Sequence, residues 1–151
     1  MLKTKGIFLI PLTITPGAEN SGRILKGYPS LRVTHIEDDH RLNLIYNAAD
    51  VLWHPSLADN ASLTILEAFA SGTPAVASKV GGIQEMIIDG EDGFFVEPGN
   101  PEQLAGKTDA LFSDDRRRLD MSKKARQRAI SCYSPEFFLD RYEGLYRRIV
   151  G

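Results

Sequence analysis

The sequence is poor in three features, and each shortage excludes a class of protein. It has a single cysteine, Cys132, which rules out an internal disulfide and fits a reducing compartment. Its 18 Lys and Arg are outnumbered by 20 Asp and Glu, and the net charge of −2 argues against a nucleic-acid partner. No apolar run approaches the roughly 20 residues that span a bilayer, and the N-terminus lacks a signal-peptide pattern. We therefore expect a cytoplasmic protein with at most peripheral membrane contact.

Motifs of several well-known enzyme sites are also missing. No Gly-x-Gly-x-x-Gly follows the first expected strand, which disfavours a dinucleotide oxidoreductase. His35, His40 and His54 do not have metal-ligand spacing, so no metal site is predicted. We interpret His54 as a packing or hydrogen-bonding residue rather than a base, and Cys132 as a packed or half-exposed helical residue rather than a nucleophile. The basic run at residues 116–118 is interleaved with acids and is interpreted as a solvated helix face.

What the sequence does have is the composition and periodicity of one soluble α/β domain, expected over residues 1–151. With 42% hydrophobic and 25% charged residues, the chain is long enough to bury a core. Short apolar runs predict strands at residues 7–10, 31–36, 49–54, 74–78 and 93–96. Helices are predicted at residues 18–26, 38–48, 83–88, 101–112, 115–131 and 135–148, with a further one between residues 60 and 72. This alternation implies a doubly wound, mostly parallel sheet flanked by helices.

The most informative stretch is residues 59–74, which reads as a polar loop, a short helix and a Gly-Thr-Pro stop. Asn60 or Ser62 can cap the helix, and Gly72 with Pro74 can end it. Strong helix formers fill its middle. Three apolar residues share one face at helical spacing, namely Leu63, Leu66 and Ala70.

Two acids accompany this helix, Asp59 just before it and Glu67 inside it. Helical side chains lean toward the N-terminus, so Glu67 can reach back over the helix start. Free backbone N–H groups and the positive end of the helix dipole also lie there, and both suit a phosphate. The arrangement fits a ligand that combines hydroxyls with a phosphate, such as a sugar nucleotide.

The same residues allow plainer interpretations. Thr64 and Glu67 match a capping box, which would start the helix at Ile65 and leave Glu67 to satisfy the backbone. A glycoside hydrolase also uses two carboxylates, as acid and base, but we disfavour it because Glu67 is on a helix that should face the nucleotide. Gly81 and Gly82 could bring the backbone close to a ligand, or could serve the turn alone.

Three runs together resemble a known family. They are Asp50-Val51-Leu52-Trp53-His54-Pro55-Ser56, the stretch from Asp59 to Ser78, and Gly81-Gly82-Ile83-Gln84-Glu85. Over roughly residues 38–150, the chain resembles the C-terminal, donor-binding domain of the group 1 family of retaining glycosyltransferases, which have the GT-B fold. The family signature is Glu-x7-Glu followed by Ala-Met-Ala-x-Gly-x-Pro-Val-Val-Ala. Here Asp59 stands for the first Glu, Glu67 for the second and Phe69 for the Met.

The resemblance implies a parent enzyme that moves a sugar from a UDP-, GDP- or ADP-sugar to an acceptor hydroxyl and requires no metal or cofactor. It implies that Asp59 is the catalytic residue, meeting the donor sugar near its reacting end, and that Glu67 binds the nucleotide ribose. Backbone amides that would hold the sugar and the diphosphate belong to Asn60, Ala61, Ser62, Leu63 and Thr64. Two departures stand out, because Asp59 is one methylene shorter than Glu and Asp59-Asn60 replaces the start of the usual Glu-Gly-Phe-Gly loop.

The N-terminal part departs further from the family. Relatives carry a Gly-Arg motif and then Lys-Gly after the first strand of this domain, and these basic groups neutralise the leaving diphosphate. Gly22-Arg23 and Lys26-Gly27 have too short a spacing and the wrong position, so we interpret them as a coincidence. We expect the chain to lack the first strand–helix unit and the acceptor domain that would bind a sugar, lipid-linked or polysaccharide acceptor. Such a chain would bind donor weakly without turnover. The alternative is a non-catalytic nucleotide-binding or interaction module that keeps only the fold.

Overall fold

The computed structural model describes residue 36 and residues 38–151. Several expectations therefore lie outside the described residues: the strand at residues 7–10, the helix at 18–26, most of the strand at 31–36, and the Gly22-Arg23 and Lys26-Gly27 pairs.

The chain divides between Ile45 and Tyr46 into two compact units. The helix α2 (Asp39–Ala48) runs across this division. Asp38 caps it, because its side chain accepts a hydrogen bond from the His40 N–H at 2.9 Å. This confirms the helix expected at residues 38–48.

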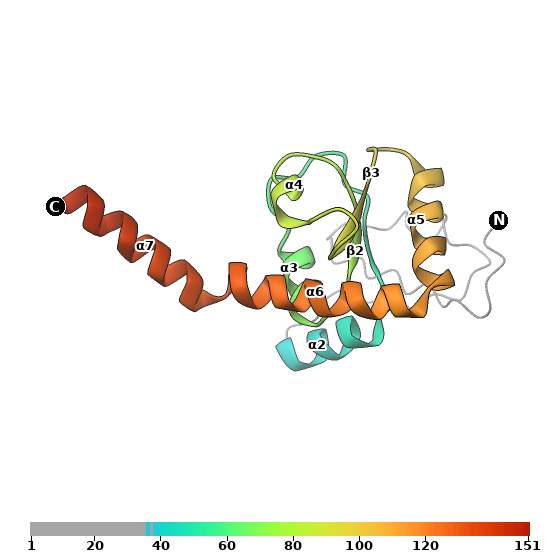
Figure 1. Cartoon of the computed structure of the whole chain (residues 1–151), viewed down its shortest axis with the longest axis horizontal. Coiled ribbons are helices and arrows are strands. Elements are labelled where there is room, and N and C mark those ends of the chain that lie inside the picture. The colour runs from blue at the N-terminus through green and yellow to red at the C-terminus, as the bar shows by residue number, and fades with distance from the viewer. Residues whose placement is uncertain (1–35, 37) are drawn as a thin grey trace. The chain divides into compact units, whose positions relative to one another are not determined.

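The core of the second unit is a parallel sheet of three strands among the described residues (Figure 1). They are β1 (Leu52–His54), β2 (Ala75–Ser78) and β3 (Gly93–Val96), in that order across the sheet. Trp53 pairs with Val76, and Val76 with Phe94. The first strand is shorter than the expected residues 49–54, whereas the expected α/β class with a parallel sheet is confirmed.

Five helices follow or separate these strands among the described residues: α3 (Leu63–Ala70), α4 (Ile83–Met86), α5 (Pro101–Ser113), α6 (Asp115–Tyr133) and α7 (Pro135–Val150). Four of them begin at a residue whose side chain accepts a hydrogen bond from the third helical N–H, namely Ser62, Asn100, Asp114 and Ser134. Local capping chemistry thus sets most of the helix starts. Helix α4 is shorter than expected, because Ile87 is already extended.

Helix α3 buries the side that carries Ile65, Ala68 and Phe69, each fully inaccessible to solvent. Their spacing is that of one helical face. Leu63, by contrast, is 73% exposed, so the apolar face noted in the sequence for Leu63, Leu66 and Ala70 is not the side that meets the core. The helix ends before Gly72, whose φ of 78° is the left-handed conformation that glycine adopts without strain.

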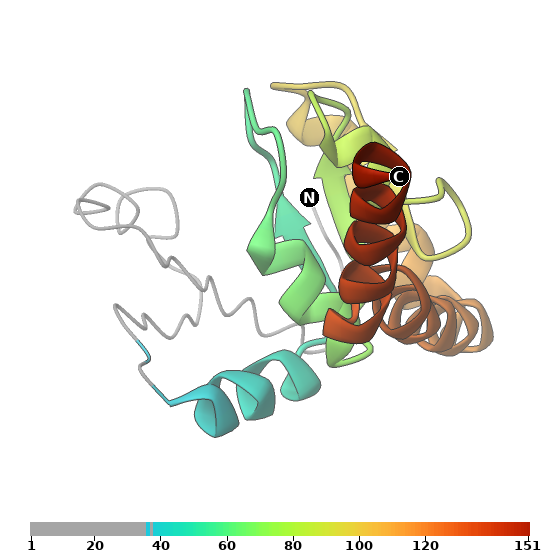
Figure 2. The same cartoon turned by 90° about the vertical axis from the view of Figure 1, so that its left-hand side faces the viewer.

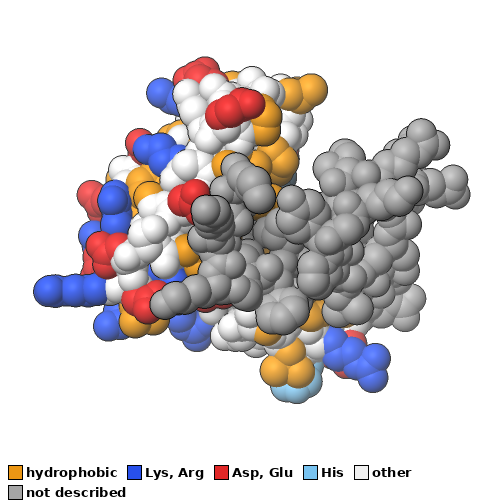
Figure 3. Space-filling view, turned by 90° about the vertical axis from the view of Figure 1, so that its right-hand side faces the viewer, with side chains coloured by type: hydrophobic (Ala, Val, Ile, Leu, Met, Phe, Trp, Pro, Cys, Tyr) orange, Lys and Arg blue, Asp and Glu red, His pale blue; other side chains and the backbone are white. Residues whose placement is uncertain are grey.

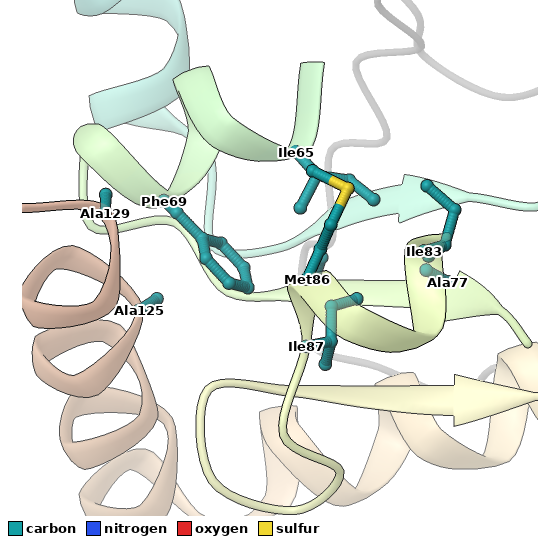
Figure 4. Packing of buried hydrophobic residues seen from close by; sticks show 9 residues of the cluster. Ile65, Phe69, Ala77, Ile83, Met86, Ile87, Ala125 and Ala129 are labelled. Carbon is teal, nitrogen blue, oxygen red and sulfur yellow. The ribbon is translucent and has the colours of Figure 1, made fainter. Parts of the chain in front are cut away.

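Two hydrophobic clusters cover the two faces of the sheet. One joins the sheet to α3 and α4 through residues that include Ile65, Phe69, Ala77 and Ile83 (Figure 4). The other joins it to α5 through Val76, Phe94, Val96 and Leu111. Successive strand residues point to opposite faces, which is why Val76 and Ala77 enter different clusters.

Helix α6 contributes to both clusters. Met121 enters the cluster beside α5, whereas Ala125 and Ala129 enter the cluster beside α3. Ser122 Oγ donates a hydrogen bond at 2.5 Å to the carbonyl oxygen of Gly72, in the turn that precedes β2. Helix α6 therefore lies at the amino end of β2. Helix α7, foremost in Figure 2, packs against α6 and has no buried residue.

Candidate functional site

The candidate site lies where β1 and β2 end. In parallel α/β sheets, ligands bind at the carboxyl ends of strands, where the connecting loops meet. Here the loop of residues 55–62 follows β1, and the turn of residues 79–82 follows β2. The backbone of Gly81 and Gly82 touches the first loop, because a Cβ added to Gly82 would lie 2.0 Å from the carbonyl oxygen of Asn60.

The same close approach explains Gly81. A Cβ at this position would lie 2.2 Å from the carbonyl oxygen of Asp59, and the φ of Gly81 is 42°. The sequence left open whether the two glycines serve a turn or approach a ligand. The structure adds a third role, since both allow the two loops to pack backbone against backbone. This packing fixes the position of Asp59 and Asn60.

The Asp59 side chain is held by two partners. Its Oδ2 lies 2.9 Å from His54 Nε2, and its Oδ1 accepts a hydrogen bond from the Ala61 N–H at 3.1 Å. The His54 and Asp59 side chains are 18% and 25% exposed, so water reaches this pair only partly. His54 belongs to β1, which anchors the pair to the sheet. The prediction that His54 is a hydrogen-bonding residue is confirmed.

The start of α3 presents backbone donors that have no acceptor in the described part of the chain. Ser62 is its N-cap, and the Ser62 Oγ accepts a hydrogen bond from the Ile65 N–H at 3.4 Å. The alternative capping box of Thr64 and Glu67, starting at Ile65, is therefore wrong, because Thr64 already lies in the first turn. Among the described residues, no acceptor is found for the N–H groups of Leu63 and Thr64. These N–H groups lie at the positive end of the helix dipole, where a bound anion is stabilised.

The other amides of the loop are engaged differently. The Ala61 N–H donates to Asp59, and the Ser62 N–H lies 3.4 Å from Met86 Sδ. Asn60 is exposed and lies against Gly82. The sequence predicts that the amides of residues 60–64 bind the sugar and the diphosphate. The structure places these five residues in the loop before α3 and in the first turn of this helix.

Glu67 lies on a different side of α3 and has a partner from α2. Its Oε2 accepts a hydrogen bond at 3.0 Å from the hydroxyl of Tyr46, and the Glu67 side chain is half-buried. Burial, and then the hydrogen bond to Glu67 and its negative charge, raise the pKa of the Tyr46 hydroxyl well above its ordinary value. Tyr46 therefore remains a protonated donor to the carboxylate.

Sequence reasoning missed Tyr46. It lies 21 residues before Glu67, on another helix, and no local pattern links the two. The only indication in the sequence is an amphipathic residue inside a short helix that precedes the first strand of the site.

The arginines at the start of α6 contact residues outside the candidate site. Arg118 contacts Asp50 at 3.3 Å and Asp115 at 2.7 Å, and the Arg117 guanidinium lies 4.9 Å from the centre of the Phe94 ring. In Figure 3, Lys and Arg side chains lie beside Asp and Glu side chains over the described part of the face. Within the basic run at residues 116–118, Arg118 is thus paired with two acids, and Arg117 lies over an aromatic ring.

Across residue 36 and residues 38–151, no group of three or more His, Cys, Asp or Glu side chains could hold a metal ion. Within the same part of the chain, no helix has the length and apolar character needed to cross a membrane.

Comparison with known proteins agrees with this geometry. Residues 29–128 match the family model described as Glycosyl transferases group 1. A curated relative, the D-inositol 3-phosphate glycosyltransferase of Corynebacterium urealyticum, is 39% identical over 105 residues, which are 70% of this chain and 24% of the relative. The chain thus spans about a quarter of the length of this relative.

Solved structures give the same result. Sucrose-phosphate synthase from Thermosynechococcus elongatus matches with a TM-score of 0.74 and 31% identity, over 81% of this chain and 30% of that one. The C-terminal domain of LpcC, a glycosyl transferase group 1 protein from Francisella tularensis, matches with a TM-score of 0.65 and 29% identity, over 72% of this chain and 56% of that one. Anabaena HepE, solved with UDP and glucose, matches with a TM-score of 0.72 and 23% identity, over 83% of this chain and 34% of that one. The chain therefore belongs to the group 1 glycosyl transferases and corresponds to the C-terminal domain of their GT-B fold.

Proposed function

We propose that this chain is the donor-binding domain of a retaining glycosyltransferase and binds a nucleotide-diphosphate sugar. One observation carries the proposal. At the start of α3, the Leu63 and Thr64 N–H groups have no acceptor among the described residues, and two carboxylates held by separate partners, Asp59 and Glu67, accompany them. A nucleotide-diphosphate sugar has the matching parts, namely two phosphates between two hydroxyl-bearing rings.

Each group has a role in this proposal. The Leu63 and Thr64 N–H groups, with the helix dipole, donate to the diphosphate. Glu67 accepts hydrogen bonds from the ribose hydroxyls. Asp59 meets the donor sugar near its reacting carbon, where a fixed carboxylate stabilises positive charge that develops as the bond to the phosphate breaks. The structure of Anabaena HepE with UDP and glucose supports a ligand of this class, as a likeness of fold.

The transfer itself needs a second substrate. The proposed parent enzyme is a cytoplasmic transferase that uses no metal or cofactor and passes the sugar to a sugar, lipid-linked or polysaccharide hydroxyl. In the GT-B arrangement the acceptor is held by another domain, and holding both reactants in one geometry supplies a large part of the rate. We therefore expect this chain alone to bind the donor but not to turn it over.

A second candidate is a non-catalytic nucleotide-binding module. One observation favours it: the Ala61 and Ser62 amides are already used inside the site loop, which reduces the number of donors left for a sugar or a phosphate. The two candidates differ in the donor sugar. A transferase domain gains affinity from the sugar through Asp59, whereas a nucleotide-binding module binds the free nucleotide equally well.

Calorimetric titration of the chain with UDP, GDP, ADP and their glucose conjugates tests the proposal. We expect saturable binding of one nucleotide. Glu67→Gln should weaken it about 10- to 100-fold, because one charge-assisted hydrogen bond contributes about 1.5–3 kcal/mol. Glu143→Gln is the matched control, since the Glu143 side chain is 63% exposed on α7 and pairs with Arg147 of the same helix. The proposal fails if the folded chain binds none of these nucleotides, or if both variants bind alike.

A further inference from the structure

Tyr46 is the one buried residue of α2, only 3% exposed, and its hydroxyl needs a partner inside the protein. It finds this partner on α3, where the hydroxyl donates to Glu67 Oε2 at 3.0 Å. Burial is the largest cause of the raised pKa of this hydroxyl, and the hydrogen bond to Glu67 raises it further. Tyr46 therefore contacts directly the carboxylate that the proposed donor site uses.

The backbone of Tyr46 is fixed as well. Its carbonyl oxygen accepts a hydrogen bond at 2.6 Å from Thr73 Oγ1, and Thr73 is 2% exposed. Thr73 follows the end of α3. Tyr46 is thus tied through its backbone to Thr73 after α3 and through its hydroxyl to Glu67 within α3, so this hydroxyl has little freedom to move.

A fixed donor restricts the Glu67 carboxylate. A free Glu side chain samples many rotamers, and a ligand that needs one of them must supply the free energy of ordering it. The bond from Tyr46 occupies one of about four acceptor positions on this carboxylate and leaves the others open. Because burial keeps the hydroxyl protonated, the bond persists at ordinary pH.

We propose that Tyr46 is a positioning residue, which holds the Glu67 carboxylate in the orientation that accepts the hydroxyls of the donor ribose. This inference rests on the proposed function and adds to it a residue from outside the loop and helix of the site. Tyr46 acts through Glu67 and does not itself touch the nucleotide. The plainer role for Tyr46 is packing, and phenylalanine would perform that role equally well.

The test uses Tyr46→Phe, which removes a single oxygen atom. UDP, GDP and ADP are titrated into the chain beside their 2′-deoxy and 3′-deoxy forms, and a thermal melt confirms that each variant is folded. Tyr142→Phe, at a tyrosine that is 57% exposed on α7, is the matched control. We expect Tyr46→Phe to weaken ribonucleotide binding about tenfold, as the loss of one oriented hydrogen bond does, and to reduce the preference for ribose over the deoxy forms by a similar factor. The control should change neither.

A double variant shows whether Tyr46 acts through Glu67. If it does, Tyr46→Phe combined with Glu67→Gln binds no more weakly than Glu67→Gln alone. Equal weakening of ribose and deoxyribose ligands, additive losses in the double variant, or unchanged affinity in a folded Tyr46→Phe would each overturn the inference and leave the donor site standing. Absence of nucleotide binding by the unaltered chain would instead refute the proposed function, and this inference with it.

Discussion

Gly82→Ala separates steric from conformational effects at the candidate site. Gly82 has φ −77° and ψ −5°, which alanine adopts without strain. The new methyl carbon would, however, lie 2.0 Å from the carbonyl oxygen of Asn60 and 3.1 Å from its carbon. Ordinary van der Waals contact begins at 3.4 Å, so the overlap with the oxygen exceeds 1 Å. The loop after β1 must move away by about this amount.

The cost follows from that displacement. Overpacking of a well-packed contact destabilises a protein by about 1–3 kcal/mol. A shift of about 1 Å also carries Asp59 away from the position set by His54, and misplacement on this scale can reduce function by about 100-fold. We therefore expect a lower urea midpoint together with a large loss of affinity for the donor nucleotide.

The assay pairs urea unfolding with calorimetric titration, and Gly106→Ala is the control. Gly106 lies inside α5, and a Cβ there would meet no atom within 4 Å. Alanine in a helix interior should raise the free energy of unfolding by about 0.5–1 kcal/mol and leave binding unchanged. If Gly82→Ala has the midpoint and the affinity of the unaltered chain, the two loops do not pack as described and the reasoning is refuted.

Two further predictions concern single hydrogen bonds. Thr108→Val should lower the free energy of unfolding by about 1–3 kcal/mol, measured by urea unfolding, because it removes the acceptor of the Trp53 indole N–H at 2.8 Å; an unchanged midpoint would mean that water replaces the lost partner. His54→Phe should reduce the affinity for a nucleotide sugar about five- to tenfold and leave the affinity for the free nucleotide unchanged, because it frees the Asp59 carboxylate. Equal losses for both ligands, measured by calorimetry against His54→Gln, would contradict a role of this pair toward the sugar.

Much of the fold follows from local sequence. Pro101 at a helix start, the apolar run of residues 93–96 and the stop at Gly72 each act within a few residues, and the structure places the elements where these features predict them. The ends differ by a few residues where neighbouring elements decide, as at β1, which pairs only over Leu52–His54. The length of a strand depends on how far its partner strand extends, and local propensity does not determine that.

The site was predictable only in part. The sequence brings Asp59 and Glu67 to the same helix, but it offers Asn60, Ser62 and Thr64 as possible caps, and only the bond to the Ile65 N–H selects Ser62. Contacts between distant segments were not predictable. The Tyr46 bond and the approach of Gly82 to Asn60 each join residues about 20 positions apart, which depends on how the layers pack rather than on any local pattern.

Helix α6, which contributes to both hydrophobic clusters, lies at the opposite end of β2 from the loops of the candidate site. Met121 and Ala125 tie both hydrophobic clusters to one helix, so the two clusters should unfold together in one cooperative transition. This helix lies at the amino end of β2, whereas the loops of the site leave from the carboxyl ends of β1 and β2. Substitutions at residues such as Asn60 and Ala61 should therefore change the affinity for a ligand more than the stability of the clusters.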